Sequence, residues 1–432
     1  MSPTDRHSAS TAQQTTPTPA RPAAPDRAGS PLRQFLPDVA AFATALVTAV
    51  LAALLLAGMP GCGGGVGGEG TGTFSSVSFA AGPITGFGSI VVNDVRFNDS
   101  AASVVDDDGR ALDRSVLALG SQVQVSGGKL LTAADGTVSG TATRVQVSRA
   151  VVGPAAAVNA SLGRLQVLGQ PVRLTLNTAV DDRLVGGLAS LAAGQVVEVH
   201  GNWDANTASF VATRIGLGNS QSGWRVSGPV NSLNTSALTF RIGDQTYSYA
   251  GTAPGLTLAN GALVQMSLKT SLDSQGRWQA SSSPNPGKPG VPEGGEATSV
   301  RGVVFSMASA SLFVLEGITV DASSARVSGV LRVGASVKVK GVQRSGVLQA
   351  SEVEVNDESL ERDFDLEGSI TSVDMANRRL VLRGTTVSFA SPGLKVDKGQ
   401  LSDLKVGRLV RIKGALSADK TVLEAKEIKF ED

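Results

Sequence analysis

The 432-residue chain carries 38 basic and 37 acidic residues, a formal net charge of +1, so no global field attracts polyanions and nucleic acid is disfavoured as an obligate partner. Fifty-one glycines, 17% charged residues and 4% aromatic residues are typical of many short strands joined by tight turns. The single cysteine, Cys62, excludes an internal disulfide framework and any multi-cysteine metal site.

The chain opens with a predicted disordered leader, residues 1–38, which is rich in Pro, Ala, Thr and Ser and has no apolar period. An apolar segment follows at 39–61, between arginines on one side and the Gly-rich tract 62–77 on the other. A basic flank, an apolar core and small residues are the pattern of a secretory signal. The segment is also long enough to span a bilayer, so we expect one apolar signal or anchor helix here.

Cys62 stands directly after the apolar segment, in a position that resembles the lipobox of bacterial lipoproteins. In that family the signal is cut before the cysteine, which is then lipidated. Gly61 fits the position before the cut, whereas Pro60 and Met59 depart from the usual pattern. Lipidation of Cys62 and an uncleaved anchor helix both remain open. Either one predicts a cell-envelope protein that is attached to the membrane and faces the periplasm or the outside, and Gly63 favours the outer membrane by the same resemblance.

The rest of the chain repeats with a period of about 70 residues. The sharpest element is Leu-x-x-Gly-x-x-Val-x-Val-x-Gly, which starts at Leu117, Leu191, Leu258, Leu331 and Leu404. Its first glycine predicts a turn into a strand whose alternate apolar residues face inward. The third copy departs mildly from this pattern.

Each copy also contains a first strand that is followed by a hairpin. The five hairpin segments are SIVVNDVRF, LQVLGQPVRL, LTFRIGDQTYSY, LFVLEGITV and LVLRGTTVSF. Four copies end on a further strand, whereas the third copy keeps only RWQA at that place. Five or six short antiparallel strands in one small module would expose two edges if they formed a flat sheet. Closure into an OB-like or SH3-like β-barrel is therefore expected.

The predicted fold class is all-β, with five tandem small antiparallel β-barrel modules after the disordered leader and the apolar helix. The module boundaries are 78–148, 149–219, 220–283, 297–357 and 358–432. Pro and Gly dominate the remaining segment, 284–296, which we expect to be a linker that extends and separates the third and fourth modules.

The segment GFGSIVVNDVRF from Gly86, together with LALGSQVQVSG from Leu117, resembles the domain-of-unknown-function 5666 family, found as tandem repeats in bacterial lipoproteins. The resemblance covers roughly residues 80–430 and weakens in the third copy. Asp94 stands where the family more often has glycine. The resemblance implies export and a β-barrel repeat, and it brings no activity and no site residues.

Candidate catalytic groups are scarce. His7 and His200 are the only histidines, so a Ser-His-Asp hydrolase would have to use His200, which we interpret instead as a strand residue at a barrel rim. Asp106, Asp107 and Asp108 are contiguous rather than alternating, which favours a turn over a calcium loop, and Asp181 and Asp182 have the same interpretation. No metal site and no cofactor are predicted.

Trp203, Trp224 and Trp278 are a possible ligand platform for an oligosaccharide, a peptide or single-stranded nucleic acid, although isolated aromatic residues are more often rim or core residues. Gly82, Gly86 and Gly88 lack the helix and the lysine of a phosphate loop. The basic side chains of two late strands are interpreted as solvated faces: Lys338, Lys340, Arg411 and Lys413.

The leading hypothesis is a non-catalytic, membrane-tethered lipoprotein that presents repeated modules for binding or scaffolding, with an envelope polymer or a protein as partner. Two alternatives remain. One is an OB-like protein that binds oligosaccharide or nucleic acid, and the other is an exported hydrolase that uses His200.

Overall fold

The computed structural model describes residues 78–218, 223–253, 258–287, 289–294 and 297–431. These ranges consist of β-strands, turns and single 3-10 turns, which confirms the all-β class. None of the described residues belongs to a helix with the length and apolar character needed to cross a bilayer. The predicted leader, apolar helix, Cys62 and Gly-rich tract lie outside the described residues.

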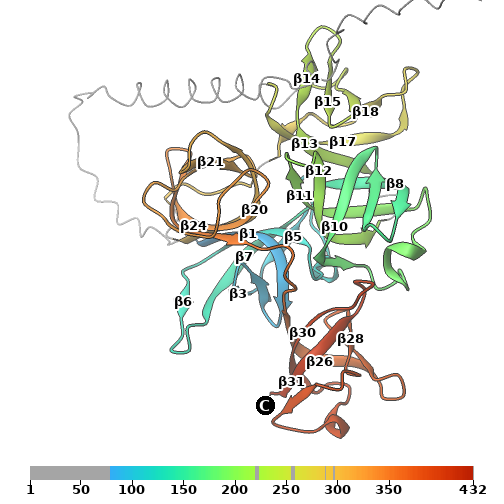
Figure 1. Ribbon diagram of the computed structural model, residues 1–432, viewed down its shortest axis with the longest axis vertical. Coiled ribbons are helices and arrows are strands. Elements are labelled where there is room, and N and C mark those ends of the chain that lie inside the picture. The colour runs from blue at the N-terminus through green and yellow to red at the C-terminus, as the bar shows by residue number, and fades with distance from the viewer. Residues whose placement is uncertain (1–77, 219–222, 254–257, 288, 295–296, 432) are drawn as a thin grey trace, which may run out of the picture. The chain divides into compact units, whose positions relative to one another are not determined.

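Four stretches form small barrels (Figure 1). Barrel A comprises β1 (Ser78–Phe87), β2 (Ile90–Val92), β3 (Val95–Asn98), β4 (Ser103–Val105), β5 (Gln122–Gly127), β6 (Leu131–Thr132) and β7 (Val138–Ser148). Barrel B comprises β8 (Val151–Asn159), β9 (Arg164–Val167), β10 (Gln170–Val180), β11 (Val196–Asp204) and β12 (Ser209–Leu217).

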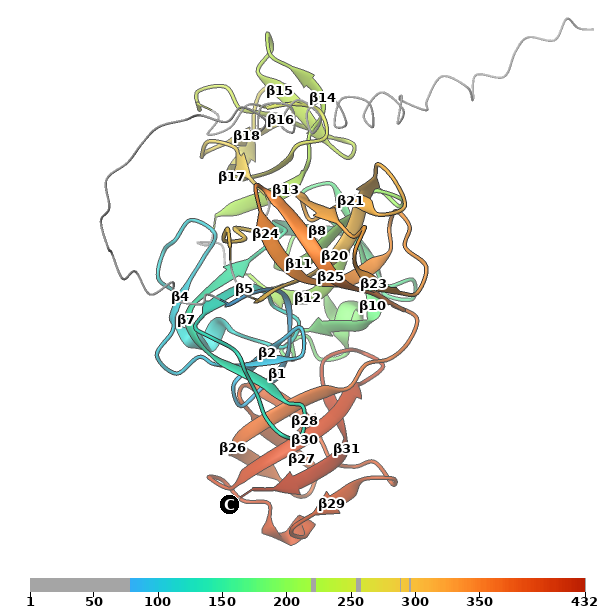
Figure 2. The same cartoon turned by 90° about the vertical axis from the view of Figure 1, so that its left-hand side faces the viewer.

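The other two barrels lie later in the chain. Barrel C comprises β20 (Ala297–Met307), β21 (Leu312–Leu315), β22 (Ile318–Asp321), β23 (Arg326–Ser328), β24 (Ser336–Arg344) and β25 (Val347–Asn356). Barrel D comprises β26 (Phe364–Asp374), β27 (Arg379–Leu382), β28 (Thr385–Ser388), β29 (Lys395–Asp397), β30 (Leu409–Leu416) and β31 (Leu423–Phe430), drawn in red in Figure 2. Short 3-10 turns precede the Leu-x-x-Gly element in barrels A, B and D: Arg114–Val116, Gly187–Ser190 and Leu401–Asp403.

Every barrel closes by the same ladder. In barrel D, β26 pairs with β27, β27 with β28, β28 with β31 in parallel, β31 with β30, and β30 again with β26. Barrels A, B and C repeat this order with their own strands. Because the ladder returns to its first strand, each ring leaves no long unpaired edge.

The predicted hairpins are confirmed. All five have two-residue turns, and in four of them both turn residues have positive φ, as the twist of a tight hairpin requires. Barrel A uses Asn93 and Asp94, with φ of 53° and 68°, so the place that the related family gives to glycine holds an aspartate in the same left-handed conformation.

The predicted Leu-x-x-Gly turn is confirmed, and it has a second role. Its glycine has positive φ in every copy, for example +77° at Gly120 and +85° at Gly407. The Gly407 N–H donates to the carbonyl of Ile370 (2.8 Å), and the Ile370 N–H donates back to the carbonyl of Arg408 (3.0 Å). Ile370 is the point where β26 shifts register and bends from one neighbour to the next. The turn therefore fastens the bend of the first strand.

The last glycine of the repeat allows a close crossing. At Gly201, Gly341 and Gly414 a β-carbon would lie 2.2 Å from a backbone oxygen of the final strand. The ladder shifts register there, so the strands bend around the barrel.

Residues 224–286, hereafter the middle segment, form β13 (Trp224–Pro229), β14 (Asn231–Asn234), β15 (Thr239–Ile242), β16 (Gln245–Ser248), β17 (Leu263–Leu272), β18 (Trp278–Ala280) and β19 (Asn285–Pro286). Its ladder runs from β13 through β17, β18, β16 and β15 to β14. Val230 alone separates β13 from β14, so a first strand is interrupted where the barrels have a bend. Leu268 occupies the place of the crossing glycine, and β17 meets β18 only at Leu268 and Leu272.

The residues that the structure describes within the expected linker 284–296, namely 284–287 and 289–294, contact neighbouring parts of the chain. Asn285 and Pro286 add a strand to β17, the Gly290 N–H donates to Gln124 of barrel A (3.0 Å), and the Gly294 N–H donates to the Gln343 carbonyl of barrel C (2.9 Å).

Strand pairing also joins the barrels. β1 pairs in parallel with β20 of barrel C over Ser78–Ala81 and with β26 of barrel D at Gly86 and Phe87. β8 of barrel B pairs with β13 of the middle segment. At Gly86 a β-carbon would lie 2.2 Å from the Asp365 carbonyl oxygen, so this glycine permits the approach of barrel D.

We predict that two glycines of barrel D differ in their sensitivity to alanine. In Gly407→Ala the new β-carbon would have no atom within 4 Å. The only expected loss of unfolding free energy comes from the left-handed backbone conformation, about 1–2 kcal/mol. Gly414→Ala must displace the backbone of Glu424, so its loss of unfolding free energy should be clearly larger. Urea unfolding of both variants measures this, and equal losses would contradict the crossing role of Gly414.

Candidate functional site

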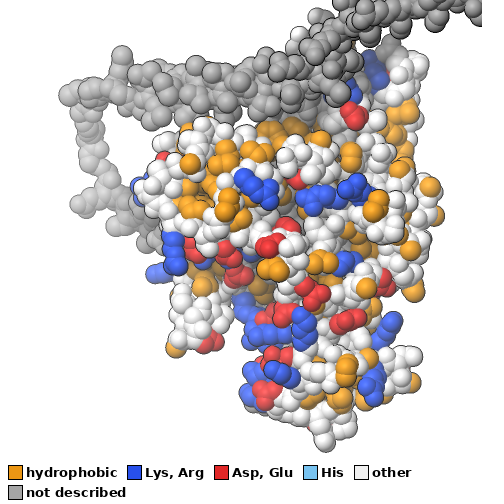
Figure 3. All heavy atoms as spheres, in the orientation of Figure 1, with side chains coloured by type: hydrophobic (Ala, Val, Ile, Leu, Met, Phe, Trp, Pro, Cys, Tyr) orange, Lys and Arg blue, Asp and Glu red, His pale blue; other side chains and the backbone are white. Residues whose placement is uncertain are grey.

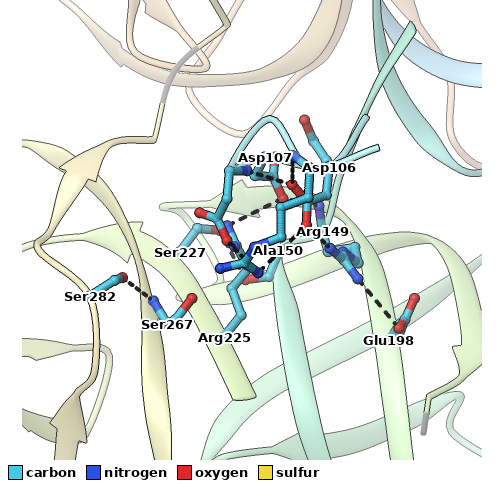
Figure 4. Close-up of polar contacts among 12 residues, drawn as sticks. Asp106, Asp107, Arg149, Ala150, Glu198, Arg225, Ser227, Ser267 and Ser282 are labelled. Atoms are coloured by element: carbon cyan, nitrogen blue, oxygen red, sulfur yellow. Dashed lines mark hydrogen bonds and ion pairs between the residues drawn. The ribbon is translucent and has the colours of Figure 1, made fainter. Parts of the chain in front are cut away.

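A buried ion network connects barrel A, barrel B and the middle segment (Figure 4). Arg225 on β13 is 5% exposed, and its guanidinium lies 3.4 Å from Asp107 and 2.5 Å from Asp108. Arg149, between barrels A and B, lies 3.7 Å from Asp106 and 3.5 Å from Glu198 on β11. The acidic run after β4 therefore meets arginines from two other parts of the chain.

The acidic run is held in place by a turn, as predicted. Asp106 Oδ1 accepts the backbone N–H groups of Asp108 and Arg110, both at 2.9 Å, and Gly109 has φ of +80°. No cluster of three or more His, Cys, Asp or Glu suited to a metal occurs in the described ranges. The sequence did not indicate Arg149 and Arg225 as partners, because they lie 42 or more residues away.

Burial raises the pKa of Asp107 above its ordinary value, although Arg225 and Arg149 act to lower it. A carboxylate in this position is tolerated only because cations and hydrogen bonds compensate for lost hydration. The network therefore fixes how the three parts meet.

A cavity of about 390 Å³ borders this network. Its walls are outward-facing side chains of barrel A, barrel B and the middle segment, with residues from barrel C and 285–290. Amide, hydroxyl and charged groups dominate: Gln122, Gln124, Gln146, Ser148, Asn202, Ser227, Gln265, Asn285, Asp107, Arg149, Arg301 and Glu316. Alternation within the strands explains this polarity, because the neighbouring Val123 and Val264 point into the barrel cores.

Of the basic residues interpreted as solvated, Lys338 is buried and Arg411 is only partly exposed. Lys338 is 5% exposed and pairs with Asp94 of barrel A and with Glu354, both at 2.5 Å, and these partners raise its pKa although burial acts to lower it. Arg411 pairs with Asp365 at 2.6 Å, and Arg96 of barrel A reaches the same carboxylate at 2.6 Å. Lys338 therefore faces carboxylates instead of water, whereas Arg411 is paired but keeps part of its side chain exposed. Lys340 pairs with Glu352 and remains about half exposed.

The three tryptophans do not form one platform. Trp203 is 7% exposed and packs edge-on against Phe210 in barrel B, with ring centroids 5.0 Å apart. Trp224 and Trp278 contact each other in the middle segment at 4.9 Å, and both are half-buried. Trp203 alone of the three lines the cavity.

His200 lies on β11, as predicted for a strand, but it is buried at the contact between barrels A and B rather than placed at a rim. Its Nδ1 lies 2.8 Å from the Ser148 carbonyl oxygen and 3.4 Å from the Gln122 backbone nitrogen, and the ring donates to the carbonyl when its proton is on Nδ1. Burial and the nearby Arg214 lower the pKa of His200 to about 3, so the ring is neutral at physiological pH. The sequence could not indicate this burial, because Ser148 belongs to the preceding module.

We predict that Arg225→Met lowers the unfolding free energy by about 3–5 kcal/mol, since it leaves the buried Asp107 without its cation. Arg241→Met in the same segment is the matched control. Its ion pair with Asp244 is exposed, so a change below about 1 kcal/mol is expected. Urea unfolding at neutral pH measures both variants. Similar losses of unfolding free energy would show that the buried network stabilises the fold no more than an exposed ion pair does.

We predict that His200 makes stability fall in mild acid. The unfolded ring titrates near 6.5 and the folded ring near 3, so the unfolded state binds the extra proton between these values. Stability is complete above pH 6.5 and decreases as the pH falls. From pH 7.5 to pH 5 the wild type should lose about 2 kcal/mol more than His200→Gln. Identical pH profiles in the two proteins would argue against this burial.

Comparison with known families agrees with the repeat pattern. The model of a domain of unknown function, DUF5666, matches four times, at residues 81–146, 152–216, 301–354 and 367–429. These are the four barrels, and the middle segment is not matched. No curated protein matches the chain significantly. Since the four matches cover more than half of the sequence, the chain belongs to the DUF5666 family.

Proposed function

We propose that this protein is a non-catalytic, membrane-tethered envelope lipoprotein whose repeated barrels bind or scaffold an envelope polymer or a protein. The polar cavity carries the proposal, because it is built jointly by several barrels and lined by side chains that no barrel needs for its own core. His200, the only histidine in the described ranges, is engaged in a buried contact, which supports a structural role for it over a hydrolytic one.

We further propose that the middle segment is a fifth, diverged copy of the module and that every copy is an OB-like barrel. The ladder of the middle segment follows the order of the barrels, apart from the interruption at Val230. Parallel pairing of the third and last strands, together with a first strand that bends to pair with both the hairpin and the fourth strand, supports the OB-like alternative. Acidic and basic side chains are interspersed on the face shown in Figure 3, which fits a partner other than nucleic acid.

The tether rests on the sequence. A basic flank, the apolar segment and Cys62 support export and lipidation, with the periplasmic face of the outer membrane or the outside as destination. An uncleaved anchor helix would also leave the barrels outside the cytoplasm.

Expression of the full chain in a Gram-negative bacterium tests the tether. We expect a mature protein in the membrane fraction whose mass corresponds to a chain that starts at an acylated Cys62, and loss of the acyl mass in Cys62→Ser. Gly65→Ser keeps the cysteine and serves as the control. An intact leader with unchanged membrane attachment in Cys62→Ser would replace lipidation by an anchor helix, and a cytosolic protein would overturn the proposed location.

A further inference from the structure

We propose that the cavity beside the ion network binds a neutral, hydroxyl-rich ligand with the size of about one or two sugar rings. The inference rests on the proposed binding function and adds the chemical class of the ligand. The volume of about 390 Å³ lies within the range of small-molecule sites.

The amides of the cavity supply the recognition groups. Gln124 is already engaged, because its Oε1 accepts from the Gly290 N–H at 3.0 Å and its Nε2 lies 3.4 Å from the Ser148 hydroxyl. The side-chain amides of Gln146 on β7 and Gln265 on β17 form no hydrogen bond with another described residue, although both residues are half-buried and line the same cavity. An amide both donates and accepts, which matches the hydroxyl group, itself a donor and an acceptor.

The charges of the cavity favour a neutral ligand. Asp107 faces Arg225 and Arg149, and Arg149 also faces Glu198, so these charges are balanced before any ligand enters. Arg301 donates to Asn356 at 3.1 Å. Glu316 accepts the Val303 N–H at 2.8 Å. An anion or a cation would have to compete with the ion pairs of Asp107 and Arg149, whereas a neutral polyol would not. Arg301 contacts only a neutral amide, so the phosphate ester used in the test below probes it directly.

The aromatic residues at the cavity wall offer little apolar surface. Trp203 and Phe210 are 7% and 1% exposed and belong to the core of barrel B, so recognition of the ligand rests on the amide groups.

Calorimetric titration of the folded chain with cellobiose, with N,N′-diacetylchitobiose and with glucose 6-phosphate tests the proposal. We expect saturable binding of at least one of the two neutral disaccharides, in preference to the phosphate ester. The variant Gln146→Leu/Gln265→Leu should weaken this binding at least about tenfold. Gln349→Leu removes an exposed amide from β25, away from the cavity, and should bind as the wild type does.

Melting temperatures show whether the double variant folds. If it does not, Gln146→Asn/Gln265→Asn retracts both amides without adding apolar atoms and should give the same weakening. Tighter binding of glucose 6-phosphate would retain a binding function but overturn the neutral ligand. No binding of any probe, or binding that both double variants leave unchanged, would overturn the cavity as a sugar site, while the membrane test decides the tether separately.

Discussion

The pair of hydrogen bonds between the Leu-x-x-Gly turn and the bend of the first strand is the constraint on which the rest of the structure depends. A first strand must serve two neighbours, the hairpin on one side and the fourth strand of the ring on the other. At the bend, the backbone N–H and carbonyl of the first strand bond to neither the hairpin nor the fourth strand. In barrel A the bend is at Ile84, whose N–H donates to the Ser121 carbonyl and whose carbonyl accepts the Gly120 N–H. Without these partners the bend would expose two unpaired buried groups, so the glycine turn makes ring closure possible.

Closure in turn determines which residues are left for contacts between barrels. Alternation buries Val123, Val337 and Val410 and turns the residues between them outward. The outward residue of the Val-x-Val pair is Gln124, Lys338 or Arg411 in barrels A, C and D. Gln124 faces the cavity, Lys338 pairs with Asp94 and Arg411 shares Asp365 with Arg96. The same position of the repeat thus makes a different contact in each of these three barrels. None of these contacts changes a core residue.

Sequence alone predicts the features that depend on local periodicity. The hairpins, the glycine turns and the all-β class follow from alternation and from residues that adopt positive φ. Contacts between modules do not follow, because a polar residue on an outward face has the same pattern whether it meets water, as Lys340 partly does, or a carboxylate from a distant strand, as Lys338 does. For the same reason the cavity was not predicted, although each of its glutamines stands at an expected outward position.

The middle segment departs from the rule that closes the four barrels. Leu268 stands where the barrels have the crossing glycine, and the first strand is interrupted at Val230. The same segment supplies Arg225 to the ion network and Gln265 to the cavity. A barrel is constrained by its own closure, whereas the middle segment is also held by β8 and by buried arginine contacts, so it can depart from the rule and remain folded. On the proposal that this segment is a diverged copy, stability supplied by its neighbours is what allows the departure.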